Sequence, residues 1–163
     1  MNLSTNSLSN EQLKIITFKD DYKEHFANLN LEWLEEYFVV EELDRKQLYN
    51  PQSIIEQGGE IFFVIEQPNV VGTCALINHG SGIYEIAKMA VTKSARSRGF
   101  GKLLMEVAIE CARQKGAHKL TIVSNTILEP AINLYKKYGF KVTRLGQNPN
   151  YERGNIEMAL ELS

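Results

Sequence analysis

Apolar and polar residues follow strand-like and helix-like periods along the chain, and the two kinds of segment are interspersed. Apolar runs or alternations of strand length occur at residues 14–19, 61–66, 70–78, 83–91, 119–124, 140–145 and 155–162. Apolar residues recur at helical spacing at 22–40, where residues 28–30 interrupt the pattern, and at 99–115 and 125–138. Shorter helical turns are expected at 44–49 and 53–57. The pattern predicts a mixed α/β fold.

The turns indicate how the strands follow one another. Residues 67–69 form the turn of a hairpin and residues 80–82 form the next turn, so antiparallel strands are expected first. A strand, a helix and a strand then follow between residues 83 and 124, which implies a parallel pair with a right-handed crossover. The last two strands are expected to form an antiparallel pair.

Composition is that of a globular chain of one domain. The 163 residues are 44% hydrophobic and 23% charged, and a chain of this size buries about 70% of its unfolded surface. Residues 13–163 are expected to form the domain, and the polar residues 1–12 a flexible tail. We see no secretory signal at this start and no apolar run near the roughly 20 residues of a membrane span. A cytoplasmic protein without a membrane partner is expected.

Cysteine and histidine residues give no indication of a disulfide or a metal site. Cys74 and Cys111 are isolated, and without a secretory signal a disulfide is not expected. His25, His79 and His118 are scattered and have no cysteine or histidine at ligand spacing. Each cysteine is interpreted as a small buried hydrophobic residue, and no metal is expected.

Charge is divided between the two parts of the chain. Residues 1–60 hold 5 basic and 12 acidic residues, whereas residues 61–163 hold 13 basic and 8 acidic ones. This division has two interpretations: two solvated faces, or a basic part that binds an anion and an acidic part that attracts a cation. Nucleic-acid binding is not expected, because the basic cluster is short and contains few aromatic residues.

The entrance of the helix at 99–115 carries the most informative chemistry. Gly99 and Gly101 lie in its first turn; glycine in a helix interior costs roughly 1 kcal/mol relative to alanine, but it lets a ligand approach the backbone. A first turn has unpaired N–H groups and the positive end of the helix dipole, so it favours an anion. Between residues 88 and 102 there is no acidic residue, and the basic ones are Lys88, Lys93, Arg96, Arg98 and Lys102. We interpret this segment as a phosphate or pyrophosphate cradle.

Two common phosphate-binding motifs do not fit this segment. A Walker loop needs serine or threonine after its Gly-Lys pair, but Leu103 follows here. The dinucleotide fingerprint needs a third glycine at the position of Leu104. The cradle therefore belongs to another class.

The remaining pattern, Arg96-x-x-Gly99-x-Gly101, resembles the acyl-CoA-binding signature Arg/Gln-x-x-Gly-x-Gly/Ala of the GNAT acetyltransferase superfamily. A second segment, Ala131-x-x-Leu134-Tyr135-x-x-x-Gly139-Phe140, is similar to a motif that these proteins carry downstream. The two motifs occur in the right order across residues 83–140, and the chain resembles small bacterial single-domain members. The resemblance implies a GNAT fold, whose central parallel strands splay apart at 89–91 and 122–124.

The resemblance also implies where acetyl-CoA, the co-substrate, would bind. The pantetheine arm would lie between the splayed strands, against backbone groups of Met89, Ala90 and Val91, and an N–H near Met89 or Ala90 would hold the oxyanion. The pyrophosphate would be bound by backbone N–H groups of Arg96, Ser97, Arg98, Gly99, Phe100, Gly101 and Lys102. Asn125 and Asn133 match positions that line the cofactor. For Asn125 the alternative is a turn residue that caps a strand end.

Two residues match catalytic positions of the superfamily. The phenol of Tyr135 would point toward the cofactor sulfur and protonate the departing thiolate, whose unperturbed pKa is about 8.5; the alternative is a core tyrosine. Glu85 stands where the histone acetyltransferase branch has its catalytic glutamate. It would take the proton of the attacking amine, and apolar burial would raise its pKa. Lys88 stands where that branch has an apolar residue, and a surface carboxylate is the alternative for Glu85.

These expectations describe an N-acetyltransferase in which a primary amine of a small molecule or protein attacks acetyl-CoA directly in a ternary complex. Neither cysteine lies in the cradle to carry the acyl group. The acidic part of the chain suits a cationic acceptor such as a polyamine, an aminoglycoside or a lysine side chain. The alternatives are a catalytically inactive acyl-CoA-binding sensor or interaction module, and a donor with a longer acyl chain. Homodimers joined through C-terminal strands are common in the superfamily, so a homodimer is a further expectation.

Overall fold

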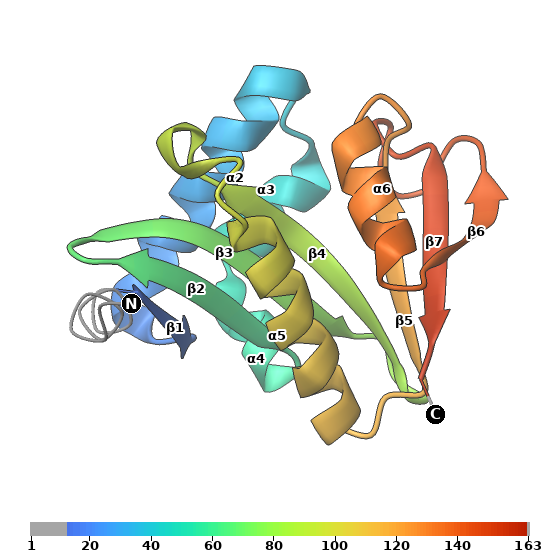
Figure 1. Cartoon of the computed structure of the whole chain (residues 1–163), viewed down its shortest axis with the longest axis horizontal. Helices are drawn as coiled ribbons and strands as arrows, with labels where there is room; N and C mark the ends of the chain where they lie inside the picture. The colour runs from blue at the N-terminus through green and yellow to red at the C-terminus, as the bar shows by residue number, and fades with distance from the viewer. Residues whose placement is uncertain (1–12, 163) are drawn as a thin grey trace, which may run out of the picture.

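The structure is a computed structural model that describes residues 13–162, and the predicted tail at 1–12 lies outside the described residues. One sheet contains seven strands in the order β1-β2-β3-β4-β5-β7-β6 (Figure 1). The strands are Leu13–Thr17 (β1), Glu60–Glu66 (β2), Asn69–Asn78 (β3), Ile83–Val91 (β4), Lys119–Ser124 (β5), Lys141–Leu145 (β6) and Ile156–Glu161 (β7). Each was predicted from the sequence, and the predicted mixed α/β fold is confirmed.

The parallel pair at the middle of the sheet is formed by β4 and β5. The two strands pair only from Ile83 opposite Lys119 to Glu85 opposite Thr121, and beyond these residues they diverge (Figure 1). The other neighbouring strands are antiparallel. α5 (Phe100–Gln114) makes the crossover from β4 to β5. The predicted splayed pair is therefore confirmed.

Helices cover both faces of the sheet. One face carries α2 (Lys23–Tyr37), α3 (Glu42–Leu48) and α4 (Pro51–Glu56), and the other carries α5 and α6 (Glu129–Lys137) (Figure 1). Short 3-10 turns precede α2 and α5, at Asp20–Tyr22 and Lys93–Ala95. None of the helices within residues 13–162 has the length and apolar character needed to cross a membrane.

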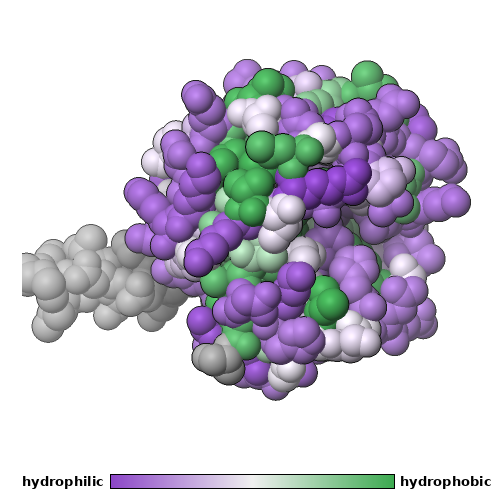
Figure 2. Space-filling view, turned by 90° about the vertical axis from the view of Figure 1, so that its right-hand side faces the viewer, coloured by the Kyte–Doolittle hydropathy of each residue, from purple (hydrophilic) through white to green (hydrophobic). Residues whose placement is uncertain are grey.

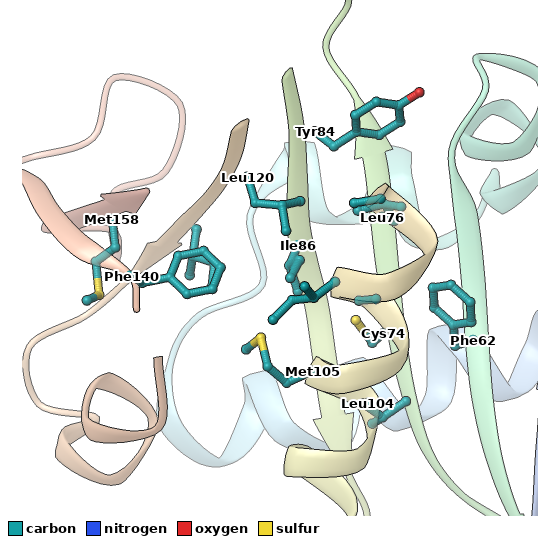
Figure 3. Close-up of a cluster of buried hydrophobic side chains, with 14 of the residues drawn as sticks. Phe62, Cys74, Leu76, Tyr84, Ile86, Leu104, Met105, Leu120, Phe140 and Met158 are labelled. Carbon is teal, nitrogen blue, oxygen red and sulfur yellow. The ribbon is translucent and has the colours of Figure 1, made fainter. Parts of the chain in front are cut away.

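Each face of the sheet has its own hydrophobic core, because side chains alternate along a strand. In β2, Ile61 and Phe63 pack toward α2–α4, whereas Phe62 and Val64 pack toward α5. Figure 3 shows the core on the α5 side, where side chains of α5 lie over those of the central strands and Phe140 fills the side next to β5. The two cores hold the ends of β4 and β5 at fixed positions.

The first helix differs from its prediction at residues 28–30. α2 runs through this segment without a break. Asn30 is buried, and its Nδ2 donates a hydrogen bond to the Phe26 carbonyl one turn earlier, at 3.0 Å. The side chain is thus satisfied within the helix instead of ending it. The expected interruption is wrong.

The helix predicted at 125–138 begins only at Glu129. The side-chain oxygen of Asn125 accepts a hydrogen bond from the Ile127 N–H at 3.0 Å, which is an Asx turn and competes with helix formation. Pro130 lies in the first helical turn, as predicted. Residues 125–128 therefore form a loop at the open end of β5.

A β-bulge in β4 changes which face its side chains occupy. Ala87 pairs with Ala75 and Ala90 with Thr73, so Lys88 and Met89 together face Cys74 of β3. Lys88 has a φ of 54°, a left-handed conformation that is uncommon for a residue other than glycine. Ala87 packs on the α2 side and Met89 on the α5 side, while Lys88 contacts α3. The bulge therefore adds Lys88 to the α2–α3 face.

β6 is the edge strand at the C-terminal side of the sheet, and all of its residues are exposed. β7 lies between β5 and β6, so the last two strands form the predicted antiparallel pair. Figure 2 shows that this side of the molecule is mostly hydrophilic, with apolar residues gathered in parts of it. Val142 and Leu145 of β6 are 42% and 68% exposed. A homodimer through these strands stays a prediction.

Candidate active site

A cavity of about 400 Å³ lies where β4 and β5 diverge. Its wall combines α2, the middle of β4, the end of β5 with the loop after it, α6, and the loop before β7. Among the predicted site residues, four line the cavity: Glu85, Met89, Asn125 and Tyr135. Segments far apart in the sequence thus meet at the splayed strands.

Tyr135 enters the cavity from α6. Ala131 and Tyr135 are four residues apart on this helix and both line the cavity, as the helical period requires. The ring packs against the core on the α5 side, with its centroid 6.3 Å from that of Phe140. Burial raises the pKa of Tyr135 to about 12. Its hydroxyl is therefore protonated at neutral pH and can act as a proton donor.

Glu85 lies on β4, with its side chain 14% exposed at the cavity. Its Oε1 is 2.7 Å from Nε2 of His79, whose side chain is 49% exposed. This hydrogen bond to Glu85 raises the pKa of His79. The surroundings of Glu85 differ from the apolar burial expected from the sequence, because its partner is an imidazole. The second carboxylate oxygen of Glu85 has no hydrogen-bond partner among the described residues.

The three predicted backbone positions on β4 differ in their access to the cavity. Met89 lines the cavity and belongs to the bulge, where it has no direct partner in the β3 ladder. Ala90 is buried opposite Thr73, and the Val91 carbonyl accepts a hydrogen bond from Arg96 Nε at 3.0 Å. Neither lines the cavity. Met89 is therefore the backbone position of this set that faces the open end of the strands.

The predicted cradle is an exposed loop that leads into α5. Ser97 and Gly99 have φ values of 65° and 88°, and the first backbone hydrogen bond of the helix runs from the Leu103 N–H to the Gly99 carbonyl. The six N–H groups from Ser97 to Lys102 donate to no acceptor within residues 13–162. A Cβ added at Gly99 or Gly101 would meet no atom within 4 Å. The loop thus offers a row of free donors and open space to an anion.

The side chains of the cradle hold the loop in place. Arg96 Nη1 pairs with Glu36 of α2 at 2.8 Å, and its buried Nη2 has no acceptor among the described residues. Arg98 forms two hydrogen bonds with Glu66 of β2 and lies over the Phe100 ring. Because both guanidinium groups already have carboxylate partners, the backbone N–H groups supply most of the free donors.

The two predicted asparagines have different positions. Asn125 lines the cavity, and its Nδ2 donates to the Arg153 carbonyl at 2.6 Å, so it also joins the loop after β5 to the loop before β7. Both this contact and the Asx turn agree with the alternative interpretation, in which Asn125 is a turn residue at the end of a strand. Asn133 is exposed on α6 and does not line the cavity.

The two motifs that resemble the superfamily lie in one continuous matched region. The model of the acetyltransferase (GNAT) family matches residues 27–140. The chain belongs to the GNAT family. This match begins in α2 and ends at Phe140, after both motifs.

Curated N-acetyltransferase relatives match part of the chain. YjgM of Escherichia coli, an uncharacterized N-acetyltransferase, is 29% identical over 108 residues, which cover 64% of this chain and 63% of YjgM. YvbK of Bacillus subtilis, also an uncharacterized N-acetyltransferase, is 31% identical over 84 residues, which cover 52% of this chain and 54% of YvbK. The match therefore spans less than two thirds of either relative.

Solved GNAT structures share the fold over most of the chain. A GNAT-family acetyltransferase from Staphylococcus aureus Mu50 superposes with a TM-score of 0.83 at 22% identity, covering 93% of this chain and 99% of the other. YncA from Salmonella typhimurium, solved with its cofactor acetyl-CoA, gives a TM-score of 0.77 at 17% identity and covers 93% and 95%. At these identities the likeness concerns the fold.

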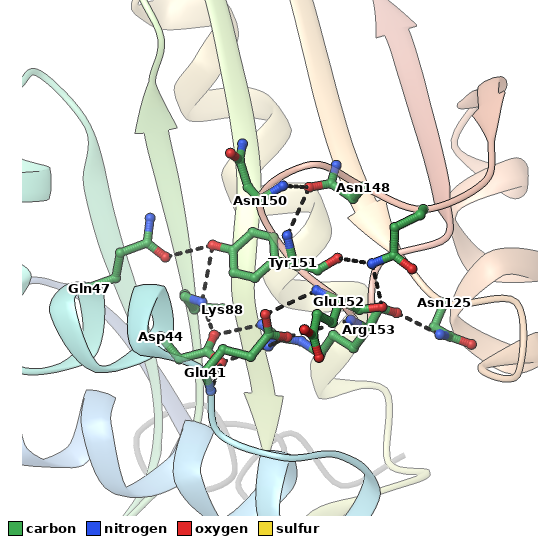
Figure 4. A network of polar contacts seen from close by, with 11 residues as sticks. Glu41, Asp44, Gln47, Lys88, Asn125, Asn148, Asn150, Tyr151, Glu152 and Arg153 are labelled. Atoms are coloured by element: carbon green, nitrogen blue, oxygen red, sulfur yellow. Dashed lines mark hydrogen bonds and ion pairs between the residues drawn. The ribbon is translucent and has the colours of Figure 1, made fainter.

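A buried cluster of charged residues lies beside the cavity, and none of its residues belongs to the two GNAT motifs (Figure 4). Lys88 Nζ lies 2.7 Å from Asp44 Oδ1, with side chains 4% and 0% exposed. Arg153 donates to both carboxylate oxygens of Asp44 at 2.6 Å and to Glu41 at 3.0 Å. Both cations lie against the Tyr151 ring, whose centroid is 4.9 Å from Lys88 Nζ and 4.6 Å from Arg153 Cζ. The cluster joins α3, β4 and the loop before β7.

Asp44 is the centre of this cluster. Burial alone would raise its pKa, but the hydrogen bonds and charges of Arg153 and Lys88 outweigh burial and hold the pKa below its usual value. Burial lowers the pKa of Lys88, and the charge of Asp44 opposes this effect. Sequence reasoning missed Asp44, Tyr151 and Arg153. The only local signal was a lysine inside an apolar strand.

Proposed function

We propose that the protein is an N-acetyltransferase that transfers the acetyl group of acetyl-CoA to a primary amine. The observation that carries this proposal is the row of six free N–H groups from Ser97 to Lys102 at the start of α5. The donors and the space over Gly99 and Gly101 fit a diphosphate, so the residues present suit acetyl-CoA. When bound, acetyl-CoA would supply an activated thioester.

The residues of the cavity support direct transfer. Glu85 would accept the proton of the ammonium group, since only a neutral amine can attack a carbonyl carbon and an alkylamine has a pKa of about 10.4. The N–H of Met89 in the bulge would donate to the carbonyl oxygen as negative charge develops on it. Tyr135 would give its proton to the departing sulfur. An N–C bond would form and the C–S bond would break; the second proton lost by the nitrogen would restore the Tyr135 hydroxyl, and the products would be an acetamide and a free thiol.

The alternative is a module that binds acyl-CoA without turnover. A module of this kind needs the cradle but neither a proton acceptor nor a proton donor in the cavity. Glu85 and Tyr135 both line the cavity, on opposite sides of the splay, β4 and α6. Their presence favours the enzyme.

The test is release of free thiol from acetyl-CoA in the presence of a panel of amines, with mass spectrometry of the amine products. Amine-dependent thiol release matched by an equal amount of acetylated amine supports the proposal. Binding of CoA by calorimetry with no turnover of any amine supports the sensor instead. A protein that binds no CoA contradicts both functions, and a parallel series with propionyl-CoA and butyryl-CoA identifies a preference for a longer acyl group.

A further inference from the structure

The charges that line the cavity differ from those expected from the acidic part of the chain. Glu32, Glu36, Glu41 and Asp44, from α2 and the start of α3, each accept hydrogen bonds from other protein groups, and none of them lines the cavity. Glu85 is the carboxylate that lines it, together with the cations Lys88 and Arg153. Within residues 13–162 the charged residues that line the cavity are therefore Glu85, Lys88 and Arg153, and the two cations pair with Asp44 and Glu41, which lie outside the lining.

The bulge places one of these cations near Glu85. Side chains of Glu85 and Ala87 point to the α2–α3 face by ordinary alternation, because Tyr84 and Ile86 pack on the α5 side. The left-handed conformation of Lys88 adds its side chain to the same face, where it reaches Asp44. A proton acceptor and a cation thus share one wall of the cavity.

Both cations retain donors for a further anion. Arg153 uses both N–H bonds of Nη1 and one of Nη2 on Glu41 and Asp44, while its Nε and the other Nη2 proton have no acceptor among the described residues. Lys88 directs one N–H to Asp44 and lies 3.5 Å from the Tyr151 hydroxyl, which leaves its third N–H free. Asp44 and Glu41 do not line the cavity, whereas Lys88 and Arg153 do, so the charged residues of the cluster that reach the cavity are its two donors.

The cluster is also fixed in position. The Tyr151 ring packs against both cations, and its hydroxyl donates to Gln47 of α3 at 2.9 Å. Asn125 holds the Arg153 carbonyl from the other side. The free pair of donors on Arg153, at Nε and Nη2, is therefore held in place. A preorganised bidentate donor loses little entropy when it binds a carboxylate.

The remaining wall toward α2 is apolar and aromatic. Trp33, Tyr37 and Phe38 line it, and Ile127 contributes from the loop after β5. Tyr37 is 44% exposed and Ile127 66% exposed. This wall suits an apolar substituent on the ligand.

We propose that Lys88 and Arg153 form a subsite for a carboxylate of the acceptor, and that the acceptor is an amino-acid-type zwitterion with an apolar side chain. The inference rests on the proposed function and names its substrate class. Glu85 faces the amine, the two cations face the carboxylate, and the α2 wall covers the apolar group. A polyamine or an aminoglycoside would bring further positive charge to Lys88 and Arg153, which disfavours it.

The test compares matched acceptors with the unmodified protein. Leucine, leucinamide and isoamylamine share one side chain, as do phenylalanine, phenylalaninamide and phenethylamine, and within each series only the carboxylate is kept, neutralised or removed. We expect kcat/KM to be at least about tenfold higher for the amino acid than for its amide, because a charge-assisted hydrogen bond contributes about 1.5–3 kcal/mol. The amide has the less basic amine, which works against this result and so makes it more decisive.

Variants locate the effect. Arg153→Gln and Lys88→Met should each lower the ratio of kcat/KM for amino acid over amide toward one, and Arg153→Lys, which keeps the charge without the fork, should lower it less. The ratio does not depend on the fraction of folded protein, so partial loss of stability does not imitate the result. Arg144→Gln is the matched control, because Arg144 pairs with Glu157 at 3.4 Å and does not line the cavity. Its ratio should stay at the wild-type value.

Two outcomes separate this inference from the proposed function. Turnover of amines with equal or higher kcat/KM for the amide, the decarboxylated amine or a polyamine overturns the carboxylate subsite and leaves the acetyltransferase in place. An unchanged ratio in both Arg153→Gln and Lys88→Met also overturns it. Absence of turnover with every acceptor in a protein that binds CoA overturns the proposed function, and the inference with it.

Discussion

Nε2 of His79 lies 2.7 Å from Oε1 of Glu85, so the turn after β3 is tied to the proposed proton acceptor on β4. The hydrogen bond to Glu85 raises the pKa of His79, with burial opposing it. A histidine whose pKa is raised in the folded state binds its proton more tightly there. The stability it adds is full below the unfolded pKa of about 6.5 and is lost as pH rises through the folded pKa.

We therefore predict that His79→Gln destabilises the protein more at pH 5.5 than at pH 9. The side chain of His79 is 49% exposed, so the difference should be modest. Urea denaturation at a series of pH values measures it. In a Glu85→Gln background the same substitution should show a much smaller dependence on pH, and an equal dependence in both backgrounds would show that the ion pair is not its source.

Asp44 gives a prediction on stability. Asp44→Asn leaves Lys88 and Arg153 without their shared carboxylate, and breaking a buried ion pair in this way costs about 3–5 kcal/mol. Lys88→Met should cost less, because Asp44 then keeps Arg153. Urea denaturation compares the two free energies of unfolding. Glu42→Gln, on the same helix, is the control: its carboxylate is 76% exposed, and a change within about 0.5 kcal/mol is expected.

The ionisation of Asp44 also predicts how the free energy of unfolding changes at low pH. The pKa of Asp44 is held below its usual value, so its contribution is present above the unfolded pKa of about 3.9 and is lost as pH falls through the folded pKa. The free energy of unfolding of the wild type should therefore fall more steeply below pH 4 than that of Asp44→Asn. Parallel slopes for the two proteins would contradict this assignment.

The strands and the cradle could be predicted because their signals are local. The alternation along 155–162 and the apolar runs at 83–91 and 119–124 identify strands from neighbouring residues alone. Gly99 has a left-handed backbone at the helix entrance, Gly101 follows in the first turn, and both adjoin open space. Their motif could be read without knowing any distant contact.

The charged cluster could not be predicted, because it depends on distant contacts. The side chain of Lys88 reaches the α2–α3 face through a bulge, and the bulge is set by the register between β3 and β4. Simple alternation would have placed it on the α5 side. Asp44 is separated by 44 residues from Lys88, and Arg153 lies in a loop with no periodicity. Only the packing of α3 on the sheet brings the three together.

Gly101 tests the cradle without loss of the fold. A Cβ at this position meets nothing within 4 Å, and glutamate both forms helix better than glycine and favours a first turn. Gly101→Glu should therefore keep or raise the melting temperature, while its carboxylate competes for the free N–H groups and repels a diphosphate. We expect at least about a tenfold loss of CoA affinity, equal to about 1.4 kcal/mol, by calorimetry.

Gly101→Gln separates charge from size in this experiment. It adds a side chain of the same length without the negative charge, so its affinity for CoA should lie between those of the wild type and Gly101→Glu. Raising the salt concentration should narrow the difference between the two variants, because the repulsion is screened. Wild-type affinity in Gly101→Glu would exclude the start of α5 as the diphosphate site.

Tyr135 tests the chemical step. Tyr135→Phe removes the hydroxyl and keeps the ring that packs near Phe140, so folding and CoA affinity should be retained. A positioned general acid contributes about 10²–10⁴-fold, and kcat should fall by a factor in this range. Because the pKa of Tyr135 is about 12, ionisation of its hydroxyl should not lower the wild-type rate in assays up to pH 9.

Tyr138→Phe is the matched control: the Tyr138 hydroxyl donates to Glu106 at 2.8 Å, outside the cavity, and kcat should not change. Equal kcat values for Tyr135→Phe and the wild type would assign the proton of the leaving thiol to another donor.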